Sequence, residues 1–594
     1  MFTTRPTLQG TFGMVSSTHW LASQSAMAVL EGGGNAYDAA VAAGFVLHVV
    51  EPHLNGPAGE VPIILAPAGG EVRVLCGQGP APGGASVEHY RSLGLDLVPG
   101  TGPLAAAVPG AFDAWMVLLR DHGTKSLAEV LSYAIGYAEH GHPAVEGIGA
   151  TVDSVRELFE TEWTTSAAVY LPSPRPGELF RNPALAATWR RLLRETEGGD
   201  REAGIEAARR IWREGFIGEA IAAFAARPAF DTSGERHAAT LTGDDLTAYE
   251  AQYEAPVAHD WNGWTVCKAG PWSQGPVLPQ QLALLPDELE YGTPDYVHTL
   301  IEGTKLAMAD REAWYGDAHD DIPLDALLSP AYNAARRALI EPGKASYELR
   351  PGSPGGRTPR LPRYALHDPT TDDGFEAMGI GGTGEPTVAA SGLTRGDTCH
   401  LDVVDRWGNM VAATPSGGWL QSNPVIPGLG FPLGTRLQMA WLEPGLPNSL
   451  TPGRRPRTTL TPSLALRDGV PVLAFGTPGG DQQDQWSLHF FLAAALRAPV
   501  RGGLDLQGAI DAPNWHTDSF PSSFHPRTMR PGSVTVESRI GDAVIEGLRR
   551  RGHDLTVGPS WSEGRLCAVA RDPETGLLSA AANARGMQGY AVGR

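Results

Sequence analysis

The chain has 594 residues, of which 42% are hydrophobic and 19% are charged, so its composition is that of a globular protein with a substantial core. Its formal net charge of −20 disfavours binding to nucleic acid or to anionic membrane surfaces, because both require lysine and arginine. The length predicts two or more structural units, or one large layered domain.

The four cysteines are few and scattered, so they predict neither a disulfide framework nor a zinc site. Residues 1–10 lack the basic region and apolar core of a signal peptide. No run approaches the roughly 20 apolar residues of a membrane span. We therefore expect a cytoplasmic protein with no metal, no cofactor, no nucleic-acid partner and no membrane partner.

Residues 14–50 predict two consecutive helices. The first is alanine-rich and stops at the three glycines of 32–34, and the second runs from Ala36 to about Val50 with Asn35 as its N-cap. The second helix is apolar almost all round, which predicts burial between layers. Later helical periodicity and strand patterns follow in order: helices at 110–122, 126–140, 183–195, 203–226 and 294–315, and strands at 61–65 and 264–267.

The composition changes between residues 342 and 395, where Pro, Gly, Arg, Asp and Thr dominate without a sustained period. Such a stretch buries little apolar surface, which predicts a mobile loop or linker. It ends at Asp397 and Thr398. The remainder is rich in strand patterns, with helices near 485–497 and 539–552. These elements predict a mixed α and β fold in which helices cover stacked sheets.

Residues 396–418 predict a strand, a tight turn and a second strand. If Arg406 pairs with Asn409, the ladder brings Thr398 opposite Gly417 and beside Ser416. A threonine hydroxyl is a weak nucleophile until a base activates it, and an α-amino group freed by cleavage is one such base. The reference pKa of an α-amino group lies near 8, so it accepts a proton at neutral pH.

Several motifs along the chain resemble the γ-glutamyltranspeptidase family of N-terminal-nucleophile (Ntn) hydrolases. They are residues 33–43 (GGNAYDAAVAA), 50–53 (VEPH), 305–311 (KLAMADR), 397–400 (DTCH), 455–462 (RPRTTLTP) and 476–480 (GTPGG). The resemblance runs nearly end to end, and the last three motifs carry it most strongly.

The resemblance implies an α+β fold of four layers, αββα, made as a precursor that cleaves itself before Thr398. Cleavage would leave a large fragment, 1–397, and a small one, 398–594, that stay associated as one domain with further dimerisation allowed. Carried over by position, Thr398 is the nucleophile and Ser416 its supporting hydroxyl. The amides of Gly479 and Gly480 form the oxyanion hole, and two aligned N–H donors can stabilise a tetrahedral oxyanion.

The substrate-binding positions depart from the family pattern. Gln78 stands where the family holds an α-carboxylate with arginine, and a neutral amide cannot supply that charged clamp. Paired serines become Thr458 and Thr459. An asparagine that helps to bind the α-amino group becomes Gly418, and the acidic residue serving the same group is replaced by a segment carrying Arg436.

Three further positions have competing interpretations. Cys399 could itself be an N-terminal nucleophile, but adjacent strand residues face opposite ways, and the resemblance favours Thr398. Asp481 is either a polar cap of the following helix or part of a pocket wall that selects substrate. His400 and His516 are interpreted as satisfied core histidines, because the α-amino group already supplies the base.

The leading hypothesis is an autoprocessed amide hydrolase or acyltransferase whose small-molecule amide donates a γ-glutamyl or related carboxylate-bearing acyl group. A second hypothesis is an amidohydrolase on a glutaryl- or oxamate-type amide, because Gln78, Gly418 and Arg436 would remove ammonium recognition but leave positive charge for a carboxylate. A third is an uncleaved, non-catalytic binding protein.

Overall fold

Two seven-stranded antiparallel sheets form the centre of the molecule in a computed structural model that describes residues 3–318, 322–363, 398–497, 503–586 and 588–594. Sheet I has the order β21 (Tyr590–Gly593), β2 (Gly13–Ser17), β12 (Leu401–Asp405), β13 (Met410–Ala413), β3 (Val61–Ala66), β4 (Arg73–Gly77) and β9 (Gln252–Glu254). Sheet II has the order β1 (Leu8–Gly10), β20 (Leu578–Ala582), β19 (Cys567–Arg571), β15 (Val470–Gly476), β14 (Ser463–Arg467), β11 (Trp264–Lys268) and β10 (Val257–Trp261).

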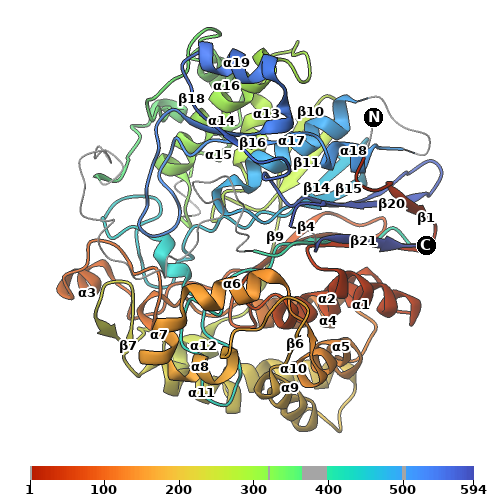
Figure 1. Cartoon of the computed structure of the whole chain (residues 1–594), viewed down its shortest axis with the longest axis vertical. Coiled ribbons are helices and arrows are strands. Elements are labelled where there is room, and N and C mark those ends of the chain that lie inside the picture. The colour runs from red at the N-terminus through yellow and green to blue at the C-terminus, as the bar shows by residue number, and fades with distance from the viewer. Residues whose placement is uncertain (1–2, 319–321, 364–397, 498–502, 587) are drawn as a thin grey trace.

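Helices cover the outer face of each sheet, as Figure 1 shows. The larger helical layer lies on sheet I and includes α1 (Trp20–Glu31), α2 (Ala36–Val50), α4 (Ala111–His122), α5 (Leu127–His140), α9 (Pro183–Glu195), α10 (Arg201–Arg213) and α11 (Phe216–Ala225). The layer on sheet II includes α13 (Val277–Ala283), α14 (Pro294–Trp314), α17 (Gln483–Leu496), α18 (Leu506–Ile510) and α19 (Asp542–Arg550). The fold is therefore the expected four-layer αββα sandwich.

Shorter elements decorate these layers. They are the helices α3 (Val87–Ser92), α6 (Glu146–Ser154), α7 (Arg156–Thr161), α8 (Thr164–Tyr170), α12 (Gly243–Ala248), α15 (Leu324–Leu327) and α16 (Pro330–Arg337), and the strands β5 (His142–Pro143), β6 (Leu179–Phe180), β7 (Ala229–Phe230), β8 (Arg236–His237), β16 (Trp515–His516), β17 (Ser533–Glu537) and β18 (Asp554–Gly558). Strands β16, β17 and β18 form a separate three-stranded sheet. No helix in the described ranges is long and apolar enough to cross a membrane.

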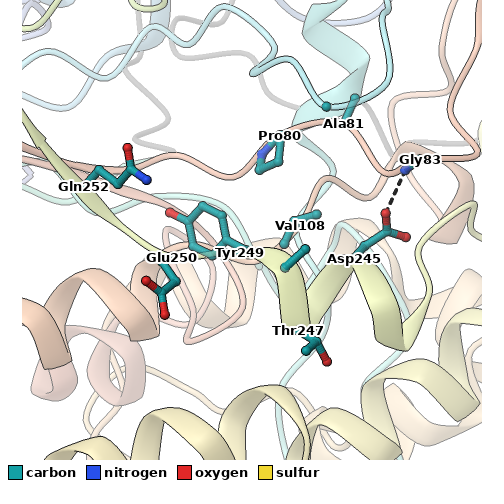
Figure 2. Close-up of a pocket in the computed structure, with 11 residues that line it drawn as sticks. Pro80, Ala81, Gly83, Val108, Asp245, Thr247, Tyr249, Glu250 and Gln252 are labelled. Carbon is teal, nitrogen blue, oxygen red and sulfur yellow. Dashed lines mark hydrogen bonds between the residues drawn. The ribbon is translucent and has the colours of Figure 1, made fainter.

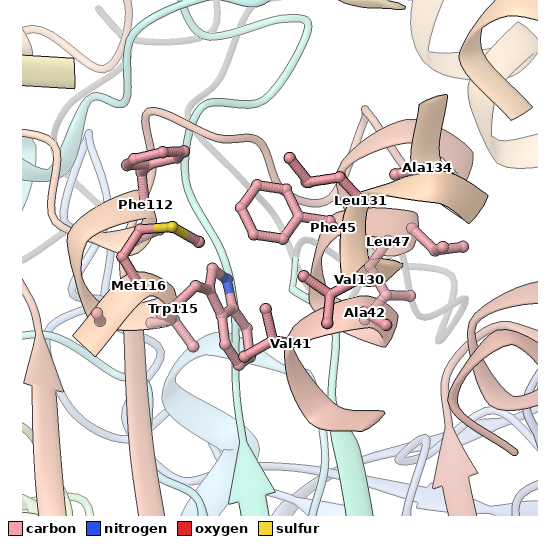
Figure 3. Packing of buried hydrophobic residues seen from close by; sticks show 14 of the residues in the cluster. Val41, Ala42, Phe45, Leu47, Phe112, Trp115, Met116, Val130, Leu131 and Ala134 are labelled. Atoms are coloured by element: carbon pink, nitrogen blue, oxygen red, sulfur yellow. The ribbon is translucent and has the colours of Figure 1, made fainter. Parts of the chain in front are cut away.

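Helix α2 is buried along its whole length, as its all-round apolar pattern predicts. Its N-terminus carries a capping box, in which the Asn35 side chain accepts from the amide of Asp38 while Asp38 accepts from the amide of Asn35. At Gly44 a Cβ would overlap the Trp115 ring of α4, so this glycine allows the two helices to touch. Figure 3 shows Trp115 packed beside Val41 of α2.

Two sequence expectations need correction. Residues 13–17 form strand β2, so the first helix begins only at Trp20. The helix expected over 203–226 is two helices, α10 and α11, separated at Gly215. The linker expected at 342–395 lies largely outside the described residues and stays a prediction; its described part, 342–363, is hydrogen-bonded to α14 and to Gly552, which follows α19.

The hairpin that begins at Thr398 has a register shifted by one residue from the expected one. Strands β12 and β13 pair Leu401 with Ala413, and the same ladder places Thr398 opposite Ser416. The turn closes between Asp405 and Asn409, with Gly408 at φ 94°. The expected pairing of Arg406 with Asn409 is wrong because the loop has three residues, and a glycine takes the positive φ that such a loop needs.

Candidate active site

Four residues line up across one end of sheet I. The ladder contacts pair Thr398 with Ser416 and Ser416 with Glu60, and the pairing of Val61 with Gly77 places Gln78 next to Glu60. Directly paired residues of an antiparallel sheet point to the same face. We call Thr398, Ser416, Glu60 and Gln78 the edge row.

Thr398 points toward sheet II, whereas Cys399 points to the helices. The hydroxyl oxygens of Thr398 and Ser416 lie 3.1 Å apart and are buried. On the opposite face, Cys399 donates from Sγ to a carboxylate oxygen of Glu51 at 2.9 Å and accepts from Asn55 at 3.2 Å. Burial and the neighbouring Glu51 hold the pKa of the Cys399 thiol well above its usual range. A thiol kept protonated is a poor nucleophile, so the geometry favours Thr398.

Gly479 and Gly480 follow strand β15 of sheet II, at the end that faces Thr398. The preceding Gly476 lies directly against the His400 ring of β12. Since β15 ends where β12 begins, residues 477–480 lead toward the edge row. Both glycines have positive φ, 138° and 48°, and a Cβ on Gly479 would overlap the Trp486 ring. Only glycine fits this backbone without strain.

The amides of these two glycines are available to a ligand. Within the described ranges neither N–H donates to a protein acceptor, whereas their carbonyl oxygens accept from the amide of Gln482 at 2.8 Å and from the side chain of Gln274 at 3.3 Å. Buried amides are normally paired. Two adjacent unpaired donors at a strand end suit a developing oxyanion.

His400 is held inside the sandwich. One ring nitrogen lies 2.9 Å from the Thr414 hydroxyl and the other lies 2.9 Å from Asp402, and all three residues are fully buried. Burial raises the pKa of Asp402 to about 6, against the influence of His400. These contacts agree with the interpretation of His400 as a core histidine.

His516 lies between two carboxylates, and its Nε2 makes no hydrogen bond within the described residues. Its Nδ1 is 2.6 Å from a carboxylate oxygen of Glu563, and its Nε2 is 3.5 Å from Asp518. Burial works against a charged imidazole, but the two carboxylates outweigh it and raise the pKa of His516 to about 10. The ring packs edge-on against Trp486, which supports Gly479. His516 thus lies behind the glycine loop.

The predicted binding residues Gln78, Thr458 and Thr459 are all buried. Gln78 donates from Nε2 to the carbonyl of Gly79 at 3.1 Å, while its Oε1 has no partner among the described residues. Thr458 accepts the Leu460 amide at 3.3 Å, and the Thr459 hydroxyl is equally unpartnered in the described structure. Orphaned buried polar atoms are costly, which is consistent with a site that a ligand completes.

Arg436 forms a buried ion pair with Glu60. Its guanidinium also lies over Trp419, 5.2 Å from the ring centroid, and near Phe524. Burial raises the pKa of the Glu60 carboxyl, and Arg436 opposes that shift. Pairing with Glu60 therefore argues against the expectation that the Arg436 charge is available for a substrate carboxylate. No pattern in the sequence pointed to Glu60, because a single carboxylate before a strand carries no spacing signal.

Gly418 lies in a tightly packed turn beside this pair. It has φ 63°, and its carbonyl lies so close to Gly56 that a Cβ there would overlap it. A Cβ at 418 would lie 3.2 Å from the backbone nitrogen of Gly59, so the turn leaves little room for a side chain at this position.

Asp481 contacts protein on both carboxylate oxygens. It is paired with Arg311, and it accepts from the amide and hydroxyl of Ser523 at 2.7 and 2.6 Å. Arg311 in turn donates to the carbonyl of Pro521 at 3.1 Å. These bonds tie the glycine loop to the segment around residue 523, so Asp481 holds the loop rather than presenting an uncompensated charge.

A separate cavity of about 440 Å³ opens near the Gln78 end of the edge row (Figure 2). Its wall includes Pro80, Ala81 and Val108 on one side and Tyr249 and Gln252 on the other. Its acidic residues are occupied: Asp245 accepts the amide of Gly83 at 2.7 Å, and Glu250 pairs with Arg213 at 2.8 Å.

One group of potential metal ligands occurs in the described ranges, namely His298, Glu302 and His553. Nδ1 of His298 lies 2.9 Å from Nε2 of His553, and Nε2 of His298 lies 2.9 Å from the carbonyl oxygen of Glu341. Glu302 already pairs with Lys305 at 2.7 Å and Arg350 at 3.3 Å. Those cations oppose a further positive ion, so the group is better described as a polar contact between elements.

The chain is similar to a known family and to several known proteins. Residues 22–593 match the family model described as gamma-glutamyltranspeptidase. The chain is 31% identical to the oxamate amidohydrolase proenzyme of Klebsiella pneumoniae, over 97% of each chain. It is 77% identical to the solved structure of LmbA2991HD, with 100% of each chain covered and a TM-score of 0.95.

A more distant likeness is to the cephalosporin acylase of Bacillus halodurans, at 26% identity and a TM-score of 0.80, covering 100% of this chain and 97% of that one. The names of these two relatives refer to different substrates, oxamate and cephalosporin. Because the family model spans nearly the whole chain, the protein belongs to the γ-glutamyltranspeptidase family of hydrolases and acyltransferases.

Proposed function

We propose that the chain matures by cleavage between Asp397 and Thr398 and then hydrolyses or transfers an acyl group through a Thr398 acyl-enzyme. One observation carries the proposal: the Thr398 hydroxyl lies 3.1 Å from that of Ser416, near the loop of Gly479 and Gly480, whose amides have no acceptor among the described residues. A nucleophile beside a second hydroxyl and near oxyanion donors is the arrangement that acyl transfer needs.

In the maturation step, Oγ1 of Thr398 attacks the carbonyl carbon of residue 397. The C–N bond breaks, the nitrogen takes up the proton that Oγ1 loses and becomes the new α-amine, and an ester joins residue 397 to Oγ1. Water then hydrolyses the ester and leaves fragments 1–397 and 398–594. Strand β12 of the small fragment lies between β2 of the large fragment and β13. We therefore expect the fragments to stay associated.

In the catalytic cycle, the α-amine of Thr398 takes the proton from Oγ1, which attacks the amide carbonyl of the substrate. The oxyanion accepts from the amides of Gly479 and Gly480, and Ser416 orients Oγ1 by its hydrogen bond. The intermediate collapses as the amine leaves with the proton. Water or an acceptor amine then releases the acyl group, for which we propose γ-glutamyl or a related carboxylate-bearing chain. The scheme invokes no cofactor.

The test is N-terminal sequencing of the smaller fragment of the purified protein. We expect two fragments, with threonine at the new N-terminus, and a burst of amine from an activated anilide. Thr398→Ala should leave one unbroken chain without turnover, whereas Thr398→Ser and the matched control Cys399→Ala should still split. An unbroken wild-type chain that turns over amides at full rate would refute the mechanism, and an unbroken inactive chain would point to a binding protein.

A further inference from the structure

Glu60 is the one member of the edge row with an ionisable carboxyl side chain. Its backbone pairs with Ser416 through two hydrogen bonds of 2.9 and 3.0 Å, so it lies one strand away from the Ser416 that contacts Thr398. Adjacent strands are separated by about 4.8 Å, which places the Glu60 backbone roughly 10 Å from that of Thr398. A short acyl chain bound to Thr398 would span this distance.

Two glycines leave room for the Glu60 carboxylate. At Gly417, which has φ 72°, any Cβ would overlap this carboxylate, and Gly434 lies on another side of it. The carboxylate therefore packs against bare backbone and pairs with Arg436. This packing indicates a built contact rather than a chance approach of two surface side chains.

Arg436 keeps unused hydrogen-bonding capacity. The guanidinium is 1% exposed and contacts Trp419 and Phe524, yet its Nη2 has no acceptor among the residues that the structure describes. The Oε1 of the neighbouring row member Gln78 is likewise unpartnered there. A buried guanidinium nitrogen without an acceptor is costly, so these atoms point to a ligand that supplies both an acceptor and a donor.

We propose that Glu60 is a specificity-determining residue that cancels the charge of Arg436, so that the site takes an acyl group without net charge and excludes a free monoanionic chain. The inference rests on the proposed function and narrows its substrate class. A zwitterionic amino-acid acyl group, or an uncharged one, can use Arg436 as donor and Glu60 or Gln78 as acceptor. A glutaryl-type anion would bring an uncompensated buried charge, which is strongly unfavourable.

The experiment compares three anilides with the same leaving group: γ-glutamyl (zwitterion), valeryl (uncharged) and glutaryl (monoanion). For the wild type we expect kcat/KM on glutaryl at least tenfold below that on the better of the other two. In Glu60→Gln the unpaired Arg436 should raise the ratio of kcat/KM on glutaryl to kcat/KM on valeryl about tenfold. Glutaryl turnover equal to the others in the wild type, or a uniform loss on all three in Glu60→Gln, would overturn the proposal.

A matched control and a second readout separate this inference from the reaction itself. Asp113 and Arg209 form another buried ion pair, at 2.8 Å, within the helical layer, so Asp113→Asn should leave the order of the three anilides unchanged. Calorimetric binding of glutamine (zwitterion) and glutaramate (monoanion) needs no turnover. Glutamine should bind the wild type at least tenfold more tightly than glutaramate, and Glu60→Gln should narrow or reverse that ratio. If binding follows this order without any turnover, the Thr398 mechanism fails and the charge inference stands.

Discussion

At the scale of single residues, the candidate site depends on backbone that only glycine adopts comfortably. Gly479 and Gly480 have positive φ and leave their amides unpaired within the described structure, and Gly417 makes room for Glu60. The polar side chains then act in pairs, Thr398 with Ser416 and Glu60 with Arg436. Glycine thus makes room for the Glu60 carboxylate and shapes the backbone at residues 479–480.

We predict that Gly479→Ala reduces turnover by at least the roughly 10²–10³-fold typical of losing one oxyanion donor. The added Cβ of residue 479 would overlap the Trp486 ring, so the loop must move. The two amides would then no longer point toward the proposed oxyanion. Gly469→Ala is the matched control, because that glycine also has positive φ, 77°, but a Cβ there meets nothing within 4 Å. Single-turnover rates of both processed variants test this, and equal rates would contradict it.

At the scale of elements, the sandwich is tied together by charged groups buried between its layers. Lys268 at the end of β11 pairs with Asp484 of α17 at 3.0 Å, and both are fully buried. Lys268 also donates to the carbonyl of Thr461 and to Ser463, each at 2.8 Å. Burial raises the pKa of Asp484 to about 6, against the effect of Lys268. The pair thus fixes the helix that follows the glycine loop.

We predict that Lys268→Met destabilises the protein by about 3–5 kcal/mol, because it leaves Asp484 buried and unpaired. Combining Lys268→Met with Asp484→Leu should recover a large part of that loss, since the double change removes both charges. Thermal unfolding midpoints of the variants, compared in the same processing state, measure the difference. A double variant that loses as much as the sum of the two single variants would show that the charges are not coupled.

At the scale of the whole molecule, the contact between His516 and Glu563 joins the small sheet of β16, β17 and β18 to the segment that precedes β19 of sheet II. The raised pKa of His516, about 10, means that the folded state holds its proton more tightly than an unfolded chain does, whose imidazole titrates near 6.5. The stabilisation is therefore complete below pH 6.5 and is lost as pH rises through 10.

We expect the unfolding midpoint of the wild type to exceed that of His516→Gln by more at pH 6 than at pH 10. His489→Gln is a control with the opposite expected pH dependence, because burial lowers the pKa of His489 to about 3. At pH 6 its folded ring is neutral while the unfolded imidazole is largely protonated, so its difference from the wild type should be smaller at pH 6 than at pH 10. A His516→Gln difference that is constant with pH would contradict the assignment of a charged imidazole.

The hydrophobic periods of the sequence determined a mixed α and β fold with a buried α2 helix, because they do not depend on distant contacts. The motifs carried the family resemblance, and that resemblance implied the four layers. It also indicated that Thr398 and Ser416 would lie together, because a hairpin is a short-range structure. It missed the register by one residue, since a three-residue loop and a tighter turn are hard to distinguish from the letters alone.

Only the tertiary structure decided the charge of the site. The sequence shows Arg436 but does not show that Glu60, 376 positions away along the chain, lies against it. It shows Asp481 but not the contacts with Arg311 and Ser523 that occupy it. Ion pairs between remote segments depend on strand order and on the stacking of the two sheets, and no local pattern records them. The motifs therefore indicated candidate residues such as Thr398 and Ser416, whereas Glu60 and the electrostatics of the site required the fold.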